Sequence, residues 1–297
     1  MKKLLILLFS ILISFNSYGG LFDKTICAET DSQLRGGIVY LPNKTKPFTG
    51  KNLCEYENGQ LKSEGLIEKG KQNSKWVWWH ENGQKWVEGE FNNNIQQGTY
   101  TAWFENGQIQ MRGNFNKSKK EGGWNYWNED GQINLEQYSK DGILISETKY
   151  GYYENGKKWF EESSKYGKTD GKQTIWHKNG QLSKENIFKD GKAVGKSEEW
   201  YESGMKLAEV NYKQGKTDGA LTTWHENGQK WMERYYKADK LDGSSTWWHE
   251  NGQINLEQQY KNGKIDGKDT LWHEDGQIRS ESNWKDGECI SGDCQDR

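Results

Sequence analysis

A unit of 24 residues recurs along most of this 297-residue chain. Its marker is the tetrapeptide Glu-Asn-Gly-Gln or a close variant, and successive marker glycines are 24 residues apart, with one step of 25. The ten marker glycines are Gly59, Gly83, Gly107, Gly131, Gly156, Gly180, Gly204, Gly228, Gly252 and Gly276. A fixed period of this length indicates a repeat architecture in which each unit is one supersecondary element. We count positions within a repeat from its marker glycine.

The marker also predicts a tight turn. Asn-Gly or Asp-Gly between two β-prone runs is a strong hairpin signal, because both residues suit the positive φ angles of a type I′ turn. Ser203-Gly204 is the poorest match. A second glycine turn closes the repeat, as in Lys189-Asp190-Gly191-Lys192 and Lys261-Asn262-Gly263-Lys264. No stretch beyond the N-terminal leader has sustained helical periodicity. We therefore expect an all-β fold: an elongated antiparallel β-meander of about ten hairpin repeats in a single-layer, solenoid-like rod or arc.

Three columns of side chains emerge when the repeats are aligned. Trp occupies position −4 in eight repeats, at Trp79, Trp103, Trp127, Trp176, Trp200, Trp224, Trp248 and Trp272. Glu occupies +5 in nine, at Glu64, Glu88, Glu136, Glu161, Glu185, Glu209, Glu233, Glu257 and Glu281. An aromatic residue occupies +8 in seven, at Phe91, Phe115, Phe188, Tyr212, Tyr236, Tyr260 and Trp284.

These columns predict which residues share a face of the sheet. Counting outward from a two-residue turn pairs position −4 with +3, and it places the Glu column on the Trp face and the +8 aromatics on the opposite face. We expect rings of stacked repeats to pack against one another as a ladder on each face, because aromatic cross-strand pairs stabilise sheets.

Composition fits a thin fold with little core. Hydrophobic residues make up 32% of the chain and the mean hydropathy is −1.12. Aromatic residues nevertheless reach 13%, which argues against disorder, because disordered chains are poor in aromatics.

The N-terminus predicts export. Lys2 and Lys3 precede an apolar run that ends in the small-x-small sequence Ser17-Tyr18-Gly19, which is typical of a cleaved signal peptide over residues 1–19. The expected organisation then continues with three segments: an N-terminal cap segment over 20–49, the repeat array over 50–287 and a C-terminal cap or tail over 288–297.

Four cysteines lie only at the two ends of the chain: Cys27, Cys54, Cys289 and Cys294. An exported chain meets an oxidising compartment, so an even number of cysteines suggests disulfides. Twenty strands at about 4.8 Å spacing span on the order of 95 Å, so the ends of an open array cannot meet. We therefore predict disulfides Cys27–Cys54 and Cys289–Cys294 in a protein of the bacterial periplasm, outer envelope or extracellular space.

The repeat resembles the bacterial variant of the MORN repeat over roughly residues 38–287. Clear instances are Trp224-His225-Glu226-Asn227-Gly228-Gln229 and Trp248-His249-Glu250-Asn251-Gly252-Gln253. The opening also looks like the start of YwqK-like antitoxins of toxin–antitoxin systems, on Tyr40-Leu41-Pro42, Pro47-Phe48-Thr49-Gly50 and Tyr56-Glu57-Asn58-Gly59-Gln60. The resemblance implies an elongated β-meander without an active site, in an antitoxin or immunity-type protein. MORN arrays are otherwise linked to scaffolding, dimerisation and lipid contact.

The recurring polar side chains do not predict catalysis. The five histidines share position −3, at His80, His177, His225, His249 and His273. Equivalent positions lie about 10 Å apart, two strand spacings, whereas Zn–N bonds need about 2.0–2.1 Å. Tyr, Phe and Asn fill the same column elsewhere, which indicates a planar side chain supporting the turn. We expect the Glu column to accept hydrogen bonds from a neighbouring turn or a Trp indole. No phosphate-loop pattern occurs, so we predict no catalytic residue, cofactor or metal site, and a non-enzymatic protein.

The tryptophan excess has two interpretations, a buried ladder and a binding strip. Part-exposed rings could form the strip, since Trp supplies hot spots at protein interfaces; the candidates are Trp78, Trp86, Trp159, Trp231 and Trp247. The expected partner is a protein, with a toxin as one candidate, and the alternative is an envelope structural protein or one that binds a glycan or a membrane surface. After loss of Lys2 and Lys3 the net charge is −4, without a basic block, so we expect no nucleic-acid partner.

Overall fold

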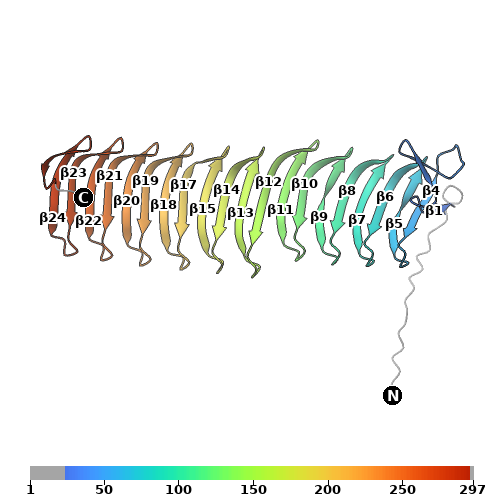
Figure 1. Ribbon diagram of the computed structural model, residues 1–297, viewed down its shortest axis with the longest axis horizontal. Helices are drawn as coiled ribbons and strands as arrows, with labels where there is room; N and C mark the ends of the chain where they lie inside the picture. The colour runs from blue at the N-terminus through green and yellow to red at the C-terminus, as the bar shows by residue number, and fades with distance from the viewer. Residues whose placement is uncertain (1–23, 295–297) are drawn as a thin grey trace, which may run out of the picture. The chain divides into compact units, whose positions relative to one another are not determined.

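The computed structural model describes residues 24–294, so the signal peptide expected over residues 1–19 lies outside the described part of the chain. The chain divides into two compact units, one ending at Gly107 and one beginning at Gln108. Both consist of strands joined by short turns, and no helix occurs among the described residues. The predicted all-β meander of antiparallel hairpins is confirmed, and in each unit of Figure 1 the strands follow one another in chain order.

The first unit contains the cap segment and the first hairpins. Its antiparallel strands are β4 (Gly50–Glu55), β5 (Leu61–Glu68), β6 (Lys71–Trp79), β7 (Lys85–Asn92) and β8 (Ile95–Trp103), each paired with the next. The cap supplies a short strand that pairs with β4 in parallel and a separate hairpin; these are β1 (Thr25–Ile26), β2 (Gln33–Arg35) and β3 (Ile38–Tyr40).

The second unit is one sheet of successive antiparallel strands. They are β9 (Ile109–Asn116), β10 (Lys119–Trp127), β11 (Ile133–Lys140), β12 (Ile143–Tyr152), β13 (Lys158–Lys165), β14 (Lys168–Trp176), β15 (Leu182–Lys189), β16 (Lys192–Ala193), β17 (Gly195–Trp200), β18 (Lys206–Lys213), β19 (Lys216–Trp224), β20 (Lys230–Lys237), β21 (Lys240–Trp248), β22 (Ile254–Lys261), β23 (Lys264–Trp272), β24 (Ile278–Lys285) and β25 (Glu288–Gly292). β15 pairs with both β16 and β17, which together occupy one place in the sheet.

The turn at the marker tetrapeptide differs from the predicted type I′ turn. At Gly252 the loop has three residues, which lie between His249 and Gln253. The His249 N–H donates to the Gln253 carbonyl at 2.8 Å, and the Gly252 N–H donates to the His249 carbonyl at 2.9 Å. Gly252 has a φ of 84°, whereas Asn251 is not among the residues with positive φ. This is a type I turn completed by a left-handed glycine. Only the glycine needs a positive φ, which is why Ser203-Gly204 fits the same turn.

Type I′ geometry occurs instead at the opposite edge of the sheet, which we call the second-turn edge. Asn262 and Gly263 both have positive φ, at 53° and 87°, and Lys261 pairs directly with Lys264 across the turn. The first residue of this turn also has positive φ where it is Tyr166, Gln214 or Ala238, so the edge tolerates side chains that rarely adopt it.

The three-residue turn changes the predicted strand register. Trp248 at −4 pairs with Ile254 at +2, and Trp247 at −5 pairs with Leu256 at +4, so the residue at +3 is the extra residue of a bulge. The predicted pairing of −4 with +3 is therefore wrong. Glu257 at +5 pairs with Thr246 at −6, which keeps the Glu and Trp columns on one face as predicted. We call this the Glu face; the +8 aromatics lie on the other, the strip face.

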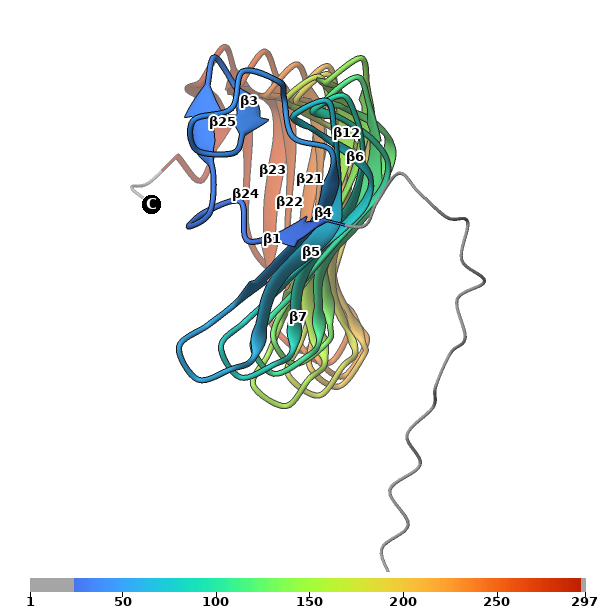
Figure 2. The same ribbon diagram turned by 90° about the vertical axis from the view of Figure 1, so that its right-hand side faces the viewer.

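A cluster of buried apolar side chains lies in the first unit, on the strip face beneath the cap. Phe48, Ile67 and Trp76 are at most 4% exposed, and Val39 and Ile26 of the cap pack against them. Figure 2 shows β1 beside β4. The cap thereby covers apolar surface that the first repeat would otherwise expose.

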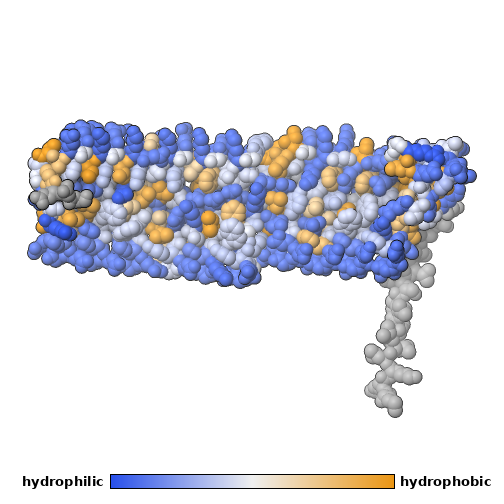
Figure 3. All heavy atoms as spheres, viewed as in Figure 1, coloured by the Kyte–Doolittle hydropathy of each residue, from blue (hydrophilic) through white to orange (hydrophobic). Residues whose placement is uncertain are grey.

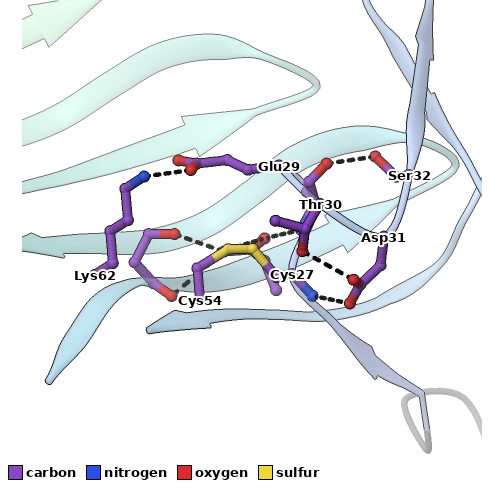
Figure 4. Close-up of a disulfide and its surroundings, with 10 residues drawn as sticks. Cys27, Glu29, Thr30, Asp31, Ser32, Cys54 and Lys62 are labelled. Atoms are coloured by element: carbon purple, nitrogen blue, oxygen red, sulfur yellow. Dashed lines mark hydrogen bonds and ion pairs between the residues drawn. A yellow bond between two sulfur atoms is a disulfide. The ribbon is translucent and has the colours of Figure 1, made fainter. Parts of the chain in front are cut away.

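Two disulfides join the predicted cysteine pairs. Cys27 bonds to Cys54, which is 1% exposed, and Figure 4 shows this bond with the Lys62–Glu29 ion pair next to it. Cys289 of β25 bonds to Cys294 after the last strand. The Cys27–Cys54 bond ties the cap to β4, and the Cys289–Cys294 bond closes the final five-residue step of the described chain.

Candidate functional site

The Glu face carries a repeated contact between a lysine, a glutamate and a tryptophan. Lys206 at +2 donates to Glu209 at +5 and to Glu198, both at 2.7 Å, and its ammonium lies 5.5 Å from the ring centroid of Trp224 in the next repeat. The same +2 lysine contacts the next Trp at three other repeats, through Lys85, Lys158 and Lys230.

This arrangement corrects two expectations. The Trp rings at −4 do not stack on one another, because equivalent positions lie about 10 Å apart and ring pairs need about 4.5–7 Å; a lysine occupies the gap and makes a cation–π contact. The Glu column does not bond mainly to turns or indoles. Its recorded partners are chiefly lysines, including those of Glu88, Glu161, Glu185, Glu209, Glu233 and Glu281.

Ion pairing shifts the titration of this column. Burial raises the pKa of Glu209, but the hydrogen-bonded ammonium groups of Lys206 and Lys196 outweigh it, so the pKa lies below its ordinary value. Glu88 has a lowered pKa for the same reason, with burial opposed by Lys75 and Lys85. These carboxylates are therefore held ionised, which suits a structural role and does not suit a general acid.

The histidine column has a structural contact. Nε2 of His177 lies 2.8 Å from the carbonyl oxygen of Trp200, and Nε2 of His249 lies 3.3 Å from that of Trp272. A carbonyl only accepts, so each ring must carry its proton on Nε2. Tyr153 and Tyr201 make the same bond through their hydroxyl groups. Where it is occupied by one of these histidines or tyrosines, the column therefore links a turn to the next repeat.

The strip face of the second unit exposes tryptophans at the bulge. Trp159 and Trp231, both at +3, are 41% and 44% exposed. A Cβ on Gly151 would lie 2.4 Å from the Trp159 ring, so this glycine leaves room for the indole. Trp231 meets Trp247 edge-on with ring centroids 5.4 Å apart. Three of the five predicted strip residues thus share one face of this unit.

Polar groups that the sequence reasoning missed surround Trp231 and Trp247. The guanidinium of Arg234 lies 4.7 Å from the Trp247 ring centroid. Its Nε, the hydroxyls of Thr223 and Ser245 and Nε2 of His225 are buried and have no hydrogen-bond partner among the described residues. A signal for this cluster was present at position +6, where Arg234 is the one cation among the ten repeats and stands between Val210 and Gln258 of the neighbouring repeats.

In the first unit, Trp86 is 48% exposed and occupies the same bulge position. Trp78 is half-buried, stacks on Trp76 with centroids 5.6 Å apart, and lines an open cavity of about 550 Å³ beneath the cap. Cap residues Leu34 and Val39 complete the apolar lining of that cavity. Trp78 therefore lies within a pocket of the cap, whereas Trp86 is open to solvent.

Between residues 24 and 294, no cluster of three or more His, Cys, Asp or Glu side chains is arranged to hold a metal ion. Over the same stretch, no helix has the length and apolar character to cross a membrane.

Comparison with known proteins matches the repeats to one family. The model of the MORN repeat variant matches eight segments: 48–69, 72–93, 96–117, 169–190, 193–214, 217–238, 241–262 and 265–286. The stretch between 117 and 169 has no match of its own, although β10 to β13 form the same hairpins there.

Solved structures of toxin complexes show a weak likeness. The Tc holotoxin pore of Photorhabdus luminescens is 12% identical with a TM-score of 0.20, covering 83% of this chain and 16% of the other. A TcdB2-TccC3-Cdc42 structure is 11% identical with a TM-score of 0.17, covering 80% and 17%. The chain thus spans about a sixth of those chains, and at these scores the likeness carries no argument. Comparison with curated proteins finds no match. With eight matched segments covering more than half of its length, the chain belongs to the MORN repeat variant family.

Proposed function

We propose that this chain is an exported, non-catalytic binding protein that presents exposed tryptophans of its strip face to a protein partner. The observation that carries the proposal is the exposure of Trp159 and Trp231 on one face of a regular sheet. Large rings on a rigid scaffold lose little conformational entropy on binding, which makes them effective anchors at protein interfaces.

Two further observations support the proposal. His80, His177 and His249 and most of the recurring Glu side chains are engaged in bonds within the sheet, which leaves them poorly suited to catalysis. Two disulfides fit an oxidising compartment outside the cytoplasm. The resemblance of residues 40–60 to YwqK-like antitoxins makes a secreted or envelope toxin the first partner to test.

The test is capture of a partner by the chain as it exists, followed by single substitutions. Trp231→Ala and Trp159→Ala should each weaken the captured complex by about tenfold or more, as expected for hot-spot residues. Tyr235→Ala is the matched control, because Tyr235 is 40% exposed and lies on the Glu face next to Arg234. Equal loss with Tyr235→Ala, or capture of glycan alone, would count against a protein-binding strip.

A further inference from the structure

The second-turn edge of the second unit carries five like-charge pairs in succession. Each type I′ turn between β13 and β23 has a lysine on either side, and the two lysines are direct cross-strand partners. The pairs are Lys165 with Lys168, Lys189 with Lys192, Lys213 with Lys216, Lys237 with Lys240 and Lys261 with Lys264. We call these ten exposed residues the lysine edge.

The fold does not require lysine on both sides of the turn. At the equivalent place Glu288 opposes Lys285, and Glu68 opposes Lys71. Like charges directly opposite destabilise a sheet, whereas opposite charges stabilise it. Five successive lysine pairs therefore stand where the repeat also accepts glutamate and where lysine does not stabilise the sheet. This points to a role of these lysines in binding rather than in folding.

The charge of the lysine edge is largely unneutralised. Lys189 pairs with Asp170 at 2.9 Å, but the other nine lysines form no ion pair with any residue of the described chain. The carboxylates nearest to the edge are Asp190 and Asp239 at the turn tips, and Asp170, Asp218, Asp242 and Asp266 just below them. Those last four accept a hydrogen bond from the main-chain N–H of the next turn, which occupies part of each carboxylate.

The geometry of the edge selects among anionic partners. Equivalent turns lie two strands apart, so paired lysines recur about every 10 Å along a line. Tyr166 is the single aromatic residue at the five tips, so there is no row of rings on which bases could stack. The tips also lack the large apolar side chains with which peripheral proteins enter a bilayer.

We propose that the lysine edge binds a linear acidic polysaccharide along the second unit, with carboxylate or sulfate groups facing successive lysine pairs. Lysine suits this ligand because a compact, hydrated ammonium recognises charge without demanding the planar geometry of a bidentate guanidinium contact. The site is separate from the tryptophans of the strip face, so one chain could hold a polysaccharide at its edge and a protein on its face.

The experiment measures binding of the full chain to polygalacturonate and to dextran sulfate over a series of NaCl concentrations, with neutral dextran, an oligothymidylate and anionic phospholipid vesicles alongside. We expect binding to one or both acidic polysaccharides that weakens with salt as counterion release predicts. The two polysaccharides distinguish a carboxylate from a sulfate ligand. Tighter binding to the oligonucleotide or the vesicles, or no binding to either acidic polysaccharide at low salt, would overturn the proposal.

The decisive variant combines Lys192→Glu, Lys216→Glu and Lys240→Glu, which converts three Lys–Lys pairs into the Lys–Glu pairing seen at Lys285 and Glu288. Its Tm should be unchanged or raised, while affinity falls by roughly tenfold or more and the salt dependence becomes shallower. A control with the same charge change combines Lys44→Glu, Lys46→Glu and Lys178→Glu, which are exposed and are not among the ten residues of the lysine edge. Unchanged affinity of the first variant, or an equal loss of affinity in the control, would contradict the proposal.

Trp231→Ala should leave polysaccharide binding intact, which separates this test from that of the protein-binding strip.

Discussion

At the scale of single residues, the asparagine of the marker has a role that extends beyond its own turn. Oδ1 of Asn251 accepts the N–H of Gln253 at 2.9 Å, and Nδ2 donates to the Glu274 carbonyl of the next repeat at 2.8 Å. Asp275, in the last marker, keeps only the first type of bond. Asp130, in an internal marker, likewise keeps only the bond within its own turn. The bond to the next repeat therefore depends on the amide donor of asparagine, which an aspartate lacks.

This role predicts the effect of an Asn-to-Asp change. Asn251→Asp should lower the free energy of unfolding by about 1 kcal/mol, because it removes a donor and brings a carboxylate oxygen next to a carbonyl. Urea unfolding followed by tryptophan fluorescence measures the loss. Asp275→Asn is the matched control and should be neutral, since no later marker turn offers a carbonyl. An equal effect of both changes would contradict a stabilising bond from Asn251 to the next repeat.

Backbone conformation gives a second prediction at this scale. Gly228 has a φ of 85°, so Gly228→Val should destabilise the fold by about 1–2 kcal/mol, the cost of a left-handed conformation for an L-residue. Ser203 precedes the equivalent glycine and is not among the residues with positive φ, so Ser203→Ala should be close to neutral. Thermal unfolding of the two variants compares them directly, and equal stability would refute the turn assignment.

At the scale of the elements, each hairpin is tied to the next at both ends of its strands. The marker turns are linked by the −3 and asparagine bonds, and the second turns are linked by main-chain bonds such as Gly263 N–H to the Leu241 carbonyl at 2.7 Å. The acidic residue at +14 adds a bond, as from the Asn262 N–H to Asp242. The single step of 25 residues is accommodated within β12, the longest strand. One hairpin alone would be marginal, so these links are what make the array stable.

Acid should weaken this network. The folded pKa of Glu209 lies below its ordinary value of 4.5, so its contribution to stability is present above that value and is lost as the pH falls through the lower, folded pKa. We expect Tm to decline as the pH is lowered through and below about 4. Lys206→Met should raise the pKa of Glu209, measurable by NMR of its carboxyl carbon, and make the decline shallower.

Lys216→Met supplies the comparison for that experiment. Lys216 forms no ion pair among the described residues, and its opposite neighbour is Lys213. The substitution should therefore leave the acid dependence of Tm as it is in the parent chain. A decline that is equally shallow in both variants would show that the Lys206 contacts do not account for it.

At the scale of the whole molecule, the two disulfides act on different parts of the chain with different strength. Cys27 and Cys54 are 27 residues apart, and Cys289 and Cys294 are five apart. The loop-entropy relation gives about 3–4 kcal/mol for the longer loop and about 2 kcal/mol for the shorter. Cys54 is buried, whereas Cys294 is exposed.

We therefore expect an ordered response to reductant. Mild reduction followed by alkylation and mass spectrometry should label Cys289 and Cys294 before Cys27 and Cys54, because access of the attacking thiolate governs the rate. Replacing Cys27 and Cys54 together with serine should destabilise the first unit more than the same double change at Cys289 and Cys294 destabilises the second. The reverse order would contradict the protection of Cys54 by the cap.

The sequence alone determined the period, the all-β hairpin architecture, the two disulfides and the sharing of one face by the Trp and Glu columns. The period, the hairpins and the shared face follow from local turn chemistry and from the alternation of side chains along a strand, which each repeat's own residues determine. The disulfides follow from the position of the cysteines at the two ends of a long array. The turn type could not be read from Asn-Gly, because that dipeptide suits both a two-residue turn and a three-residue turn ending in a left-handed glycine. Only the pairing of the strands shows that the three-residue turn occurs. The same pairing places Trp248 opposite Ile254 at +2.

Tertiary structure also decided which side chains meet across repeats. The lysine at +2 fills the space between tryptophans that are two strands apart, and Arg234 reaches Trp247 in the neighbouring repeat. The charged residues are evenly spread in the sequence, but the hairpins bring lysines from about a hundred residues of chain onto one edge of the sheet. Such contacts join residues 10 to 24 positions apart, and their partners are set by strand register, which a shift of one residue would change entirely.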